Sequence, residues 1–247
     1  MSMAAGAAGL VDAIVGGGGL ILVPALFTTY PSVAPATLFG TNKAAAIWGT
    51  AWAASQYVRR VQLNWRSLVP AALAALLGAW SGALSVIHLP AQELRRGLPL
   101  VLLLVLVYTL VHKDLGRVHA PRHSLRRETG VAVVIGSLVG FYDGLFGPGT
   151  GSFFVFLLVR WLGYDFLHAS AAAKLLNTTT NLAALALFVT TGHILWTLAA
   201  SMAVANVMGS MVGARLALRH GAGFVRAAFI LVVGALILRT GYDIWWR

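Results

Sequence analysis

The chain contains no cysteine, and only 7 of its 247 residues are acidic. The absence of cysteine excludes disulfide bonds, thiolate metal sites and cysteine nucleophiles together. Charged residues make up 10% of the chain and hydrophobic residues 59%. Soluble domains carry about 25% charged residues. We therefore expect an integral membrane protein.

The sequence also lacks the motifs of common catalytic sites. It has no phosphate-binding Walker motif and no set of nucleophile and base at a recognisable spacing. The close histidine pair His119 and His123 flanks Pro121 in a basic stretch, where a metal site is not expected. We predict a protein that is not an enzyme and that needs no cofactor or metal.

The formal net charge of +11 raises the question of nucleic acid binding. The basic residues lie between apolar spans, so orientation in the membrane and contact with anionic lipid explain them better. The first residues, 1–19, lack the basic start of a cleavable signal peptide, and we expect them to be retained. The predicted partners are the lipid bilayer and a small anionic substrate, not nucleic acid; the oligomeric state is left open.

An acid and a run of helix breakers interrupt the apolar sequence at 140–154, GFYDGLFGPGTGSFF. Pro148 cannot donate a helical hydrogen bond and Gly149 has no side chain, so we predict a helix end near Phe146 and a new helix from Thr150. Non-helical backbone is tolerated in a bilayer only against protein or a wet cavity. A helix that begins there offers N–H groups to an anion. The alternative is a kink between closely packed helices.

The same feature occurs earlier, at 9–19, GLVDAIVGGGG. A shift of 131 positions takes Asp12 to Asp143 and Lys43 to Lys174. It also pairs Gly9 with Gly140, Gly16 with Gly147, Gly18 with Gly149, Trp65 with Trp196, Gly78 with Gly209, Gly82 with Gly213 and Arg95 with Arg226. Matches of Asp, Lys and Trp are informative because these residues are scarce here. We predict an internal duplication with transmembrane repeats 1–112 and 128–247, joined by a basic linker, 113–127.

Six apolar spans are long enough to cross a bilayer, which takes about 20 residues. They lie at about 33–58, 67–88 and 94–112 in the first repeat and at 165–191, 195–218 and 223–246 in the second. A glycine-broken element precedes each trio, at about 3–29 and 129–160.

The positive charges indicate how the broken elements sit in the membrane. Re-entrant elements place 12 basic residues on one side and 4 on the other, whereas full crossings give 10 and 6. The positive-inside rule favours the first arrangement. Each repeat then crosses three times, so the repeats are inverted. We predict an all-α polytopic membrane protein of two inverted-topology repeats, each a Gly-broken (re-entrant or discontinuous) helix plus three transmembrane helices. Both termini lie outside and the linker is cytoplasmic.

Lys43 and Lys174 fall about 14–15 Å deep in their spans, near the bilayer midplane. From there a lysine reaches the interface poorly, and an unpaired cation costs at least about 2.5–3.5 kcal/mol. We expect the lysines to face an anion or to pair with Asp12 and Asp143. These two acids lie one helical turn before the glycine runs, and we predict that they couple transport to protons. The alternative is that they only cap free backbone N–H groups.

The predicted substrate-binding residues come from the two glycine breaks and the two lysine-bearing spans. They are Gly16, Gly17, Gly18, Gly19, Thr41, Asn42, Lys43, Gly147, Pro148, Gly149, Thr150, Gly151, Lys174, Asn177 and Asn181. Asn177 and Asn181 share a helical face with Lys174. For Asn206 and Ser210, contact between membrane helices is at least as good an explanation. The GxxxG pairs at 78–82 and 209–213 are expected to pack helices closely.

The two glycine-containing stretches, each followed by a lysine- and asparagine-bearing helix, resemble the TauE/SafE family of sulfite exporters (TSUP, the sulfonate uptake permeases). The resemblance covers almost the whole chain, and 140–154 is its most specific part. It implies a multi-pass transporter of the cell (inner) membrane, built of duplicated halves, that moves sulfite and organosulfonates such as sulfoacetate.

We therefore predict a secondary active transporter of small sulfur-containing oxyanions, of the sulfite or organosulfonate type. It works by alternating access and holds the anion at glycine-rich helix breaks near the midplane. One alternative is a permease for another small anion, carboxylate or inorganic. Another is a membrane scaffold that binds a partner through the cytoplasmic linker, but a scaffold leaves the midplane lysines and acids unexplained. The substrate, the direction of transport and the coupling ion stay open.

Overall fold

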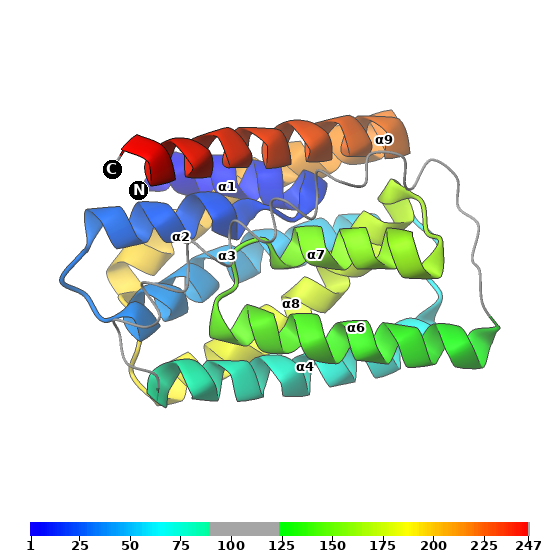
Figure 1. The fold of residues 1–247 in the computed structure, drawn as a ribbon, viewed down its shortest axis with the longest axis horizontal. Helices are drawn as coiled ribbons and strands as arrows, with labels where there is room; N and C mark the ends of the chain where they lie inside the picture. The colour runs from blue at the N-terminus through cyan, green and yellow to red at the C-terminus, as the bar shows by residue number, and fades with distance from the viewer. Residues whose placement is uncertain (89–123, 247) are drawn as a thin grey trace.

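The computed structural model describes residues 1–88 and 124–246, with the side chains of its last helix described as far as Leu231, apart from Phe229. All elements in this part of the chain are helical. They are α1 (Ser2–Val15), α2 (Gly18–Thr29), α3 (Pro35–Val58), α4 (Trp65–His88), α6 (Leu125–Leu145), α7 (Thr150–Leu157), the π-helical turn η1 (Leu158–Leu162), α8 (Phe166–Thr190) and α9 (Trp196–Trp246). Figure 1 shows α1, α2, α4, α6, α7 and α9 running nearly along one axis, with α3 and α8 inclined to it.

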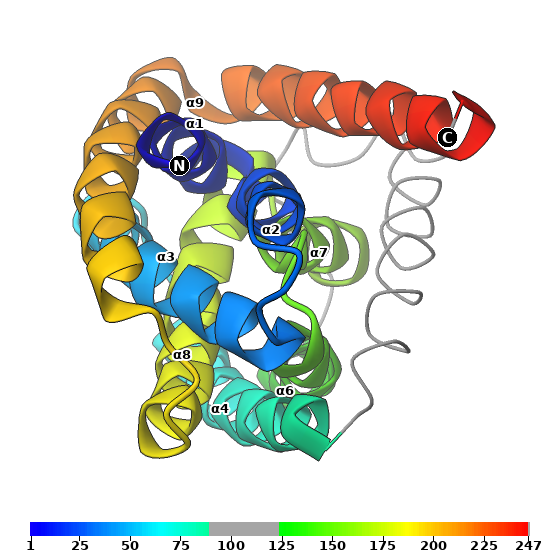
Figure 2. The same cartoon turned by 90° about the vertical axis from the view of Figure 1, so that its left-hand side faces the viewer.

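The predicted spans agree with these helices where the structure describes them. The spans 33–58, 67–88 and 165–191 are α3, α4 and α8. The spans 195–218 and 223–246 are the two arms of α9, which bends at Gly221 with φ 72° and ψ −164° (Figure 2). The predicted span 94–112 and most of the linker lie outside the described residues.

Among the described helices, four are long and apolar enough to cross a membrane: α4, α6, α8 and the Trp196–Ala228 part of α9. Their length and composition support an integral membrane protein. At 21 residues, α6 alone is about 31 Å long. The first arm of the element expected at 129–160 is therefore longer than a short re-entrant arm. α3 is not among the four because polar residues occupy its middle, and other helices bury 16 of its 24 residues.

Both glycine stretches reverse the chain direction. α6 ends at Leu145, with Phe146 as its C-cap, and α7 begins at Thr150, as the sequence predicted. Gly147 and Gly149 have φ of 87° and 82°, and Gly16 has φ of 80°. These values lie in the left-handed region that favours glycine. In Figure 1, α1 runs from left to right and α2 returns, whereas α6 runs from right to left and α7 returns.

The two reversals touch each other inside the bundle. The backbone N–H of Ser152 donates to the carbonyl of Gly16 at 3.2 Å, and its hydroxyl donates to the carbonyl of Val15 at 3.0 Å. A Cβ on Gly151 would lie 2.4 Å from the Cα of Gly16, so only glycine permits this approach. The glycine breaks are thus a direct contact between the two halves of the chain.

The GxxxG pairs pack helices of one half against helices of the other, as their spacing predicted. A Cβ on Gly78 of α4 would lie 2.5 Å from the carbonyl oxygen of Ser137 on α6. A Cβ on Gly209 of α9 would lie 1.9 Å from that of Gly6 on α1. Ser137 and Gly6 are themselves 131 positions apart. The same shift of 131 positions relates the contact of Gly82 with Phe141 to that of Gly213 with Leu10. It also relates the contact of Gly140 with Ala75 to that of Gly9 with Asn206.

Arginines gather at one end of the bundle. In Figure 1 the loop after α3, the start of α4, η1, the start of α6 and the part of α9 around its bend lie to the right. These segments carry Arg59, Arg60, Arg66, Arg126, Arg127, Arg160, Arg215 and Arg219. The N-terminus, the C-terminal end of α9 and the α2–α3 and α8–α9 loops lie to the left. In the part of the chain that the structure describes, the basic side chains therefore mark one end of the fold.

A buried carboxylate fastens the basic end together. Oε1 of Glu128, in the first turn of α6, accepts hydrogen bonds from Asn64 Nδ2 (2.9 Å), Ser67 Oγ (2.8 Å) and the Tyr164 hydroxyl (2.7 Å). Burial and the hydrogen-bonded carboxylate raise the pKa of Tyr164, so the phenol keeps its proton. The starts of α4, α6 and α8 are held in one cluster.

The close glycine contacts predict a stability difference between matched substitutions. Gly209→Ala places a methyl group against the Gly6 carbonyl, and we expect a loss of about 1–3 kcal/mol of stability. Gly130→Ala is the control, because a Cβ there meets nothing within 4 Å. It should leave stability unchanged or raise it through helix propensity. Thermal unfolding in detergent measures both, and equal unfolding temperatures would contradict the packing role.

Candidate functional site

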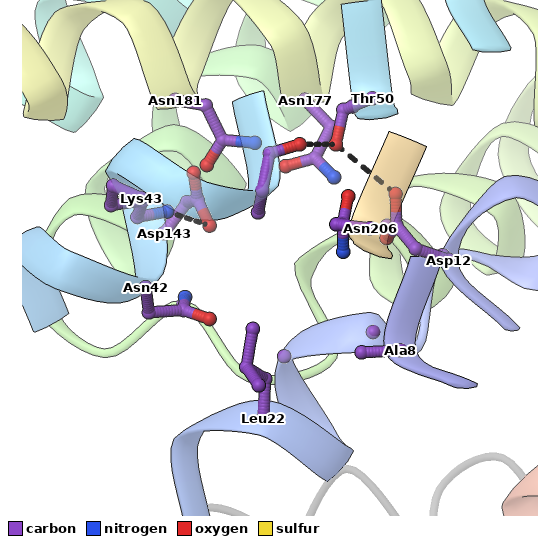
Figure 3. Close-up of a pocket in the computed structure, with 16 residues that line it drawn as sticks. Ala8, Asp12, Leu22, Asn42, Lys43, Thr50, Asp143, Asn177, Asn181 and Asn206 are labelled. Carbon is purple, nitrogen blue, oxygen red and sulfur yellow. Dashed lines mark hydrogen bonds and ion pairs between the residues drawn. The ribbon is translucent and has the colours of Figure 1, made fainter. Parts of the chain in front are cut away.

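A polar cavity lies between the two glycine breaks and the helices α3, α8 and α9 (Figure 3). Its volume is about 20 Å³, which leaves room for about one water molecule. It is lined by Ala8, Asp12, Gly16, Gly18, Gly19, Leu22, Asn42, Lys43, Ala46, Thr50, Asp143, Gly147, Gly151, Asn177, Asn181 and Asn206. Two acids, a lysine and four asparagines converge here from both halves of the chain.

Each midplane lysine pairs with the acid of the other half. Lys43 Nζ lies 2.6 Å from Asp143 Oδ1, and Lys174 Nζ lies 2.9 Å from Asp12 Oδ2. All four side chains are buried. The shift of 131 positions converts one pair into the other. The expectation that the lysines pair with these acids is confirmed, and each pair compensates two charges that would be costly alone.

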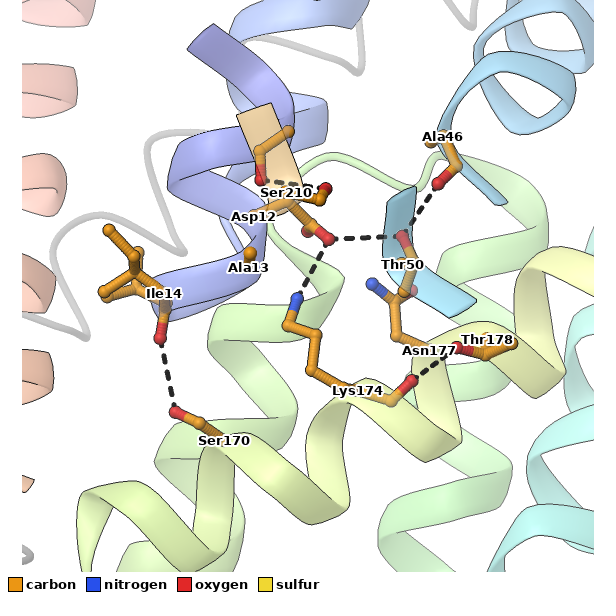
Figure 4. A network of polar contacts seen from close by, with 12 residues as sticks. Asp12, Ala13, Ile14, Ala46, Thr50, Ser170, Lys174, Asn177, Thr178 and Ser210 are labelled. Carbon is orange, nitrogen blue, oxygen red and sulfur yellow. Dashed lines mark hydrogen bonds and ion pairs between the residues drawn. The ribbon is translucent and has the colours of Figure 1, made fainter. Parts of the chain in front are cut away.

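Hydroxyl groups complete the two pairs. Thr50 Oγ1 lies 3.2 Å from Asp12 Oδ2 and donates to it (Figure 4). Thr150 Oγ1 donates to Asp143 Oδ1 at 2.6 Å. The described contacts of both carboxylates are therefore with side chains of lysine and threonine. The alternative in which these acids only cap backbone N–H groups does not match this arrangement.

The structure brings nine of the predicted substrate-binding residues to the cavity. They are Gly16, Gly18, Gly19, Asn42, Lys43, Gly147, Gly151, Asn177 and Asn181. Both acids predicted to couple protons, Asp12 and Asp143, line it as well. The glycine breaks and the lysine-bearing helices thus share one space.

Six predicted residues do not line the cavity: Gly17, Thr41, Pro148, Gly149, Thr150 and Lys174. Lys174 is fully buried and points to Asp12 (Figure 4). The Thr41 hydroxyl accepts from the backbone N–H of Leu195 at 3.0 Å and so ties α3 to the start of α9. Thr150 holds Asp143. The contacts of Lys174, Thr41 and Thr150 indicate that these side chains position helices and acids around the cavity.

Five further residues line the cavity but were not predicted: Ala8, Leu22, Ala46, Thr50 and Asn206. Ala46 and Thr50 are the positions that the 131-residue shift relates to Asn177 and Asn181, so the duplication contained a signal for Thr50. Asn206 Nδ2 donates to the carbonyl of Ala5 at 3.2 Å. Its predicted helix contact is confirmed, and the same residue also faces the cavity.

Two acceptor atoms at the cavity are left over. Among the described side chains, the buried oxygens without a hydrogen-bond partner are Asn42 Oδ1 and Asp143 Oδ2. Lys43 and the asparagine amides supply donors to the same space. The cavity can therefore bind an anion through its donors and accept a proton or a donor group from a ligand.

The position of Gly147 next to Lys43 predicts that a substitution there affects function in addition to straining the backbone. A Cβ there would lie 3.3 Å from Lys43 Nζ, and φ is 87°. Gly147→Ala should therefore reduce transport as well as stability. The control is Gly192→Ala, with φ of 73° and nothing within 4 Å of the added Cβ. It should cost similar stability, measured by thermal unfolding, and leave transport in liposomes intact. Equal loss of transport in both variants would refute a role for this turn.

Comparison with known proteins identifies the family. The model of the sulfite exporter TauE/SafE family matches residues 1–240. The chain is 35% identical over 241 residues to the probable membrane transporter protein ORF9 of a Sinorhizobium species, which covers 98% of this chain and 91% of that protein.

Other relatives carry the same description. The chain is 34% identical over 238 residues to the probable membrane transporter protein YfcA of Escherichia coli K12, covering 96% of this chain and 86% of YfcA. It is 28% identical over 259 residues to YjnA of Bacillus subtilis, covering 92% and 96%. No solved structure matches the chain. The chain belongs to the TauE/SafE family of membrane transport proteins.

Proposed function

We propose that this protein is a secondary active transporter of small sulfur-containing oxyanions that works by alternating access in the cell (inner) membrane. The observation that carries the proposal is the pair of crossed lysine–acid contacts beside the two glycine breaks, around one polar cavity. Buried charges in a membrane protein are costly and are found where ions or substrates pass.

The donors of the cavity suit a small oxyanion. Lys43 provides a compact cation, and Asn42, Asn177 and Asn181 provide amide N–H groups. A sulfite or sulfonate head presents three acceptor oxygens, which several such donors can share. The family description, sulfite exporter, favours this substrate class over a carboxylate or another inorganic anion.

The exchanged contacts support an inverted relation between the halves. The contacts of Gly78, Gly82 and Gly140 between α4 and α6 have counterparts at Gly209, Gly213 and Gly9 between α9 and α1, and the two ion pairs exchange partners in the same way. A two-fold relation produces such exchanges. α1 and α6 run in opposite directions in Figure 1, so we propose that the axis lies in the membrane plane. Rocking of one half against the other then alternates access to a shared site.

The basic end of the bundle gives the orientation. Under the positive-inside rule, the end that carries the arginines of α3, α4, α6, η1 and α9 is cytoplasmic. The two termini then lie outside. Trp65 and Trp196, equivalent in the duplication, begin α4 and α9 at opposite ends of the bundle (Figure 1), where tryptophan is favoured at membrane interfaces.

Single cysteines in this cysteine-free chain test the topology. Gln62→Cys and Thr191→Cys fall in loops that the duplication makes equivalent, after α3 and after α8. Inverted repeats predict that an impermeant maleimide labels Gln62→Cys from the cytoplasm only and Thr191→Cys from outside only. Ser32→Cys, before α3, should behave as Thr191→Cys does. Labelling of Gln62→Cys and Thr191→Cys from the same side would reject the inversion.

The substrate class is tested with purified protein and a panel of sulfite, thiosulfate, sulfoacetate, taurine, lactate and phosphate. A ligand at 100 times its Kd should add about 2.7 kcal/mol of stability. We expect sulfite or sulfoacetate to raise the unfolding temperature and to enter proteoliposomes. Taurine, a zwitterion with the same sulfonate, tests whether net charge is required. Transport of lactate or phosphate alone would favour the other small-anion permease, and transport of none would contradict the proposal.

A further inference from the structure

We propose that the two lysine–acid pairs, although equivalent in the duplication, have different roles. The Lys43–Asp143 pair opens to admit the anion, and one proton enters with the anion and binds Asp143 Oδ2. The Lys174–Asp12 pair stays closed and positions the helices. This inference rests on the proposed function and deepens it, because it assigns the binding pair and the charge that accompanies the substrate.

The first difference is access to the cavity. Both members of the Lys43–Asp143 pair line the cavity, whereas only Asp12 of the other pair does (Figure 3). Lys174 has no exposed surface and approaches Asp12 from the side of α8 (Figure 4). An anion in the cavity can therefore reach the ammonium group of Lys43 but not that of Lys174.

The second difference is the burial of the carboxylate oxygen that neither lysine nor threonine contacts. Asp12 Oδ2 accepts from Lys174 and from Thr50, which bind it to α8 and α3. Asp143 Oδ1 accepts from Lys43 and Thr150, while Asp143 Oδ2 is buried without a partner. A buried acceptor without a partner is destabilising. A proton on Oδ2 converts that oxygen into a donor that faces the bound ligand.

The residues beside the two lysines differ as well. Asn42 precedes Lys43 and presents its unpartnered oxygen at the cavity, whereas Ala173 precedes Lys174. Gly147 leaves the space next to Lys43 Nζ free, since a Cβ there would lie at 3.3 Å. The neighbourhood of Lys43 therefore offers room and polar groups to a ligand.

Charge balance requires a proton to accompany the anion. Asp143 and three other charged groups of the described residues lie at the cavity or next to it. These three are Lys43 from α3, Asp12 from α1 and, behind Asp12, Lys174 from α8. With Asp143 included, the ionised charges sum to zero. Tyr142, the neighbour on α6, donates its hydroxyl proton to the carbonyl of Pro148 and adds no charge. A monovalent anion added alone would leave a net negative charge in a low-dielectric site, which is unfavourable.

The proposed exchange is balanced in atoms and charge. The Asp143 carboxylate takes up one proton and becomes a neutral acid. Lys43 keeps its proton and replaces the carboxylate with the oxyanion as its counter-charge. The pair is neutral before binding, the pair together with its bound anion is neutral afterwards, and one proton moves with each monovalent anion. Release of the anion on the other side returns the proton and re-forms the contact between Lys43 and Asp143.

Two double variants test the assignment without leaving a lone buried charge. Lys43→Met with Asp143→Asn removes the proposed binding pair, and Lys174→Met with Asp12→Asn removes its duplicate. Folding is checked by thermal unfolding and size-exclusion chromatography, and uptake of radiolabelled sulfite is measured in proteoliposomes with the acid side outside. We expect the first variant to fall to the rate of empty liposomes, and the second to take up sulfite more slowly than the wild type but still faster when the outside is acidic. Equal loss in both, or the reverse order, would overturn the assignment.

A second measurement uses the wild-type protein and needs neither variant to fold. A hydrophobic carbodiimide modifies protonated carboxyl groups in apolar surroundings, and peptide mass spectrometry locates the product. We expect modification of Asp143 that rises as the pH falls, and little at Asp12. Preferential modification of Asp12, or none at either acid, would overturn the inference.

The two measurements also separate this inference from the proposed function. Sulfite uptake with unselective carbodiimide labelling overturns the assignment of the proton to Asp143 and leaves the proposed function intact. Selective labelling of Asp143 without transport of any anion in the panel overturns the proposed function and the anion exchange, and supports Asp143 as the proton-binding group.

Discussion

Two lysines buried in the middle of an apolar bundle each need a negative charge within contact distance, and each finds it in the other half of the chain. Lys43 lies 2.6 Å from Asp143, and Lys174 lies 2.9 Å from Asp12. Removal of one partner from a buried pair costs about 3–5 kcal/mol, because it leaves an uncompensated charge. The crossed pairs therefore bind the two halves to each other, and the arrangement of the remaining helices follows from them.

Glycine makes this crossing geometrically possible. The acids stand one turn before the breaks, and left-handed glycines reverse the chain so that α7 begins beside α1. Gly16 and Gly151 then meet backbone to backbone, and the glycines of α4 and α9 let carbonyls of α6 and α1 approach. Larger side chains at these positions would separate the halves, and with them each lysine from its acid. The polar cavity is the space that remains beside the two breaks.

The near-symmetry of the two halves stops at the cavity itself. The shift of 131 positions relates Ala46 and Thr50 to Asn177 and Asn181, and Asn42 to Ala173. The amides that face the cavity thus come from non-equivalent positions. The two predicted repeats each contribute one lysine and one acid, and the residues that differ around the two pairs underlie our proposal that one pair opens and the other stays closed. This division is consistent with one substrate at a time in a shared site.

The sequence by itself was enough to predict the duplication, the positions of the helix breaks and the scarce charged residues that belong to the site. Helix ends at Phe146 and Thr150 were predictable because proline and glycine act within a few residues. Only the tertiary structure decided which lysine contacts which acid, since Lys174 and Asp12 are 162 positions apart in the chain. It also decided that Thr50 and Asn206 face the cavity and that Thr41 and Lys174 do not. Helical periodicity gives the face of a residue, but the neighbour of that face depends on how distant helices pack.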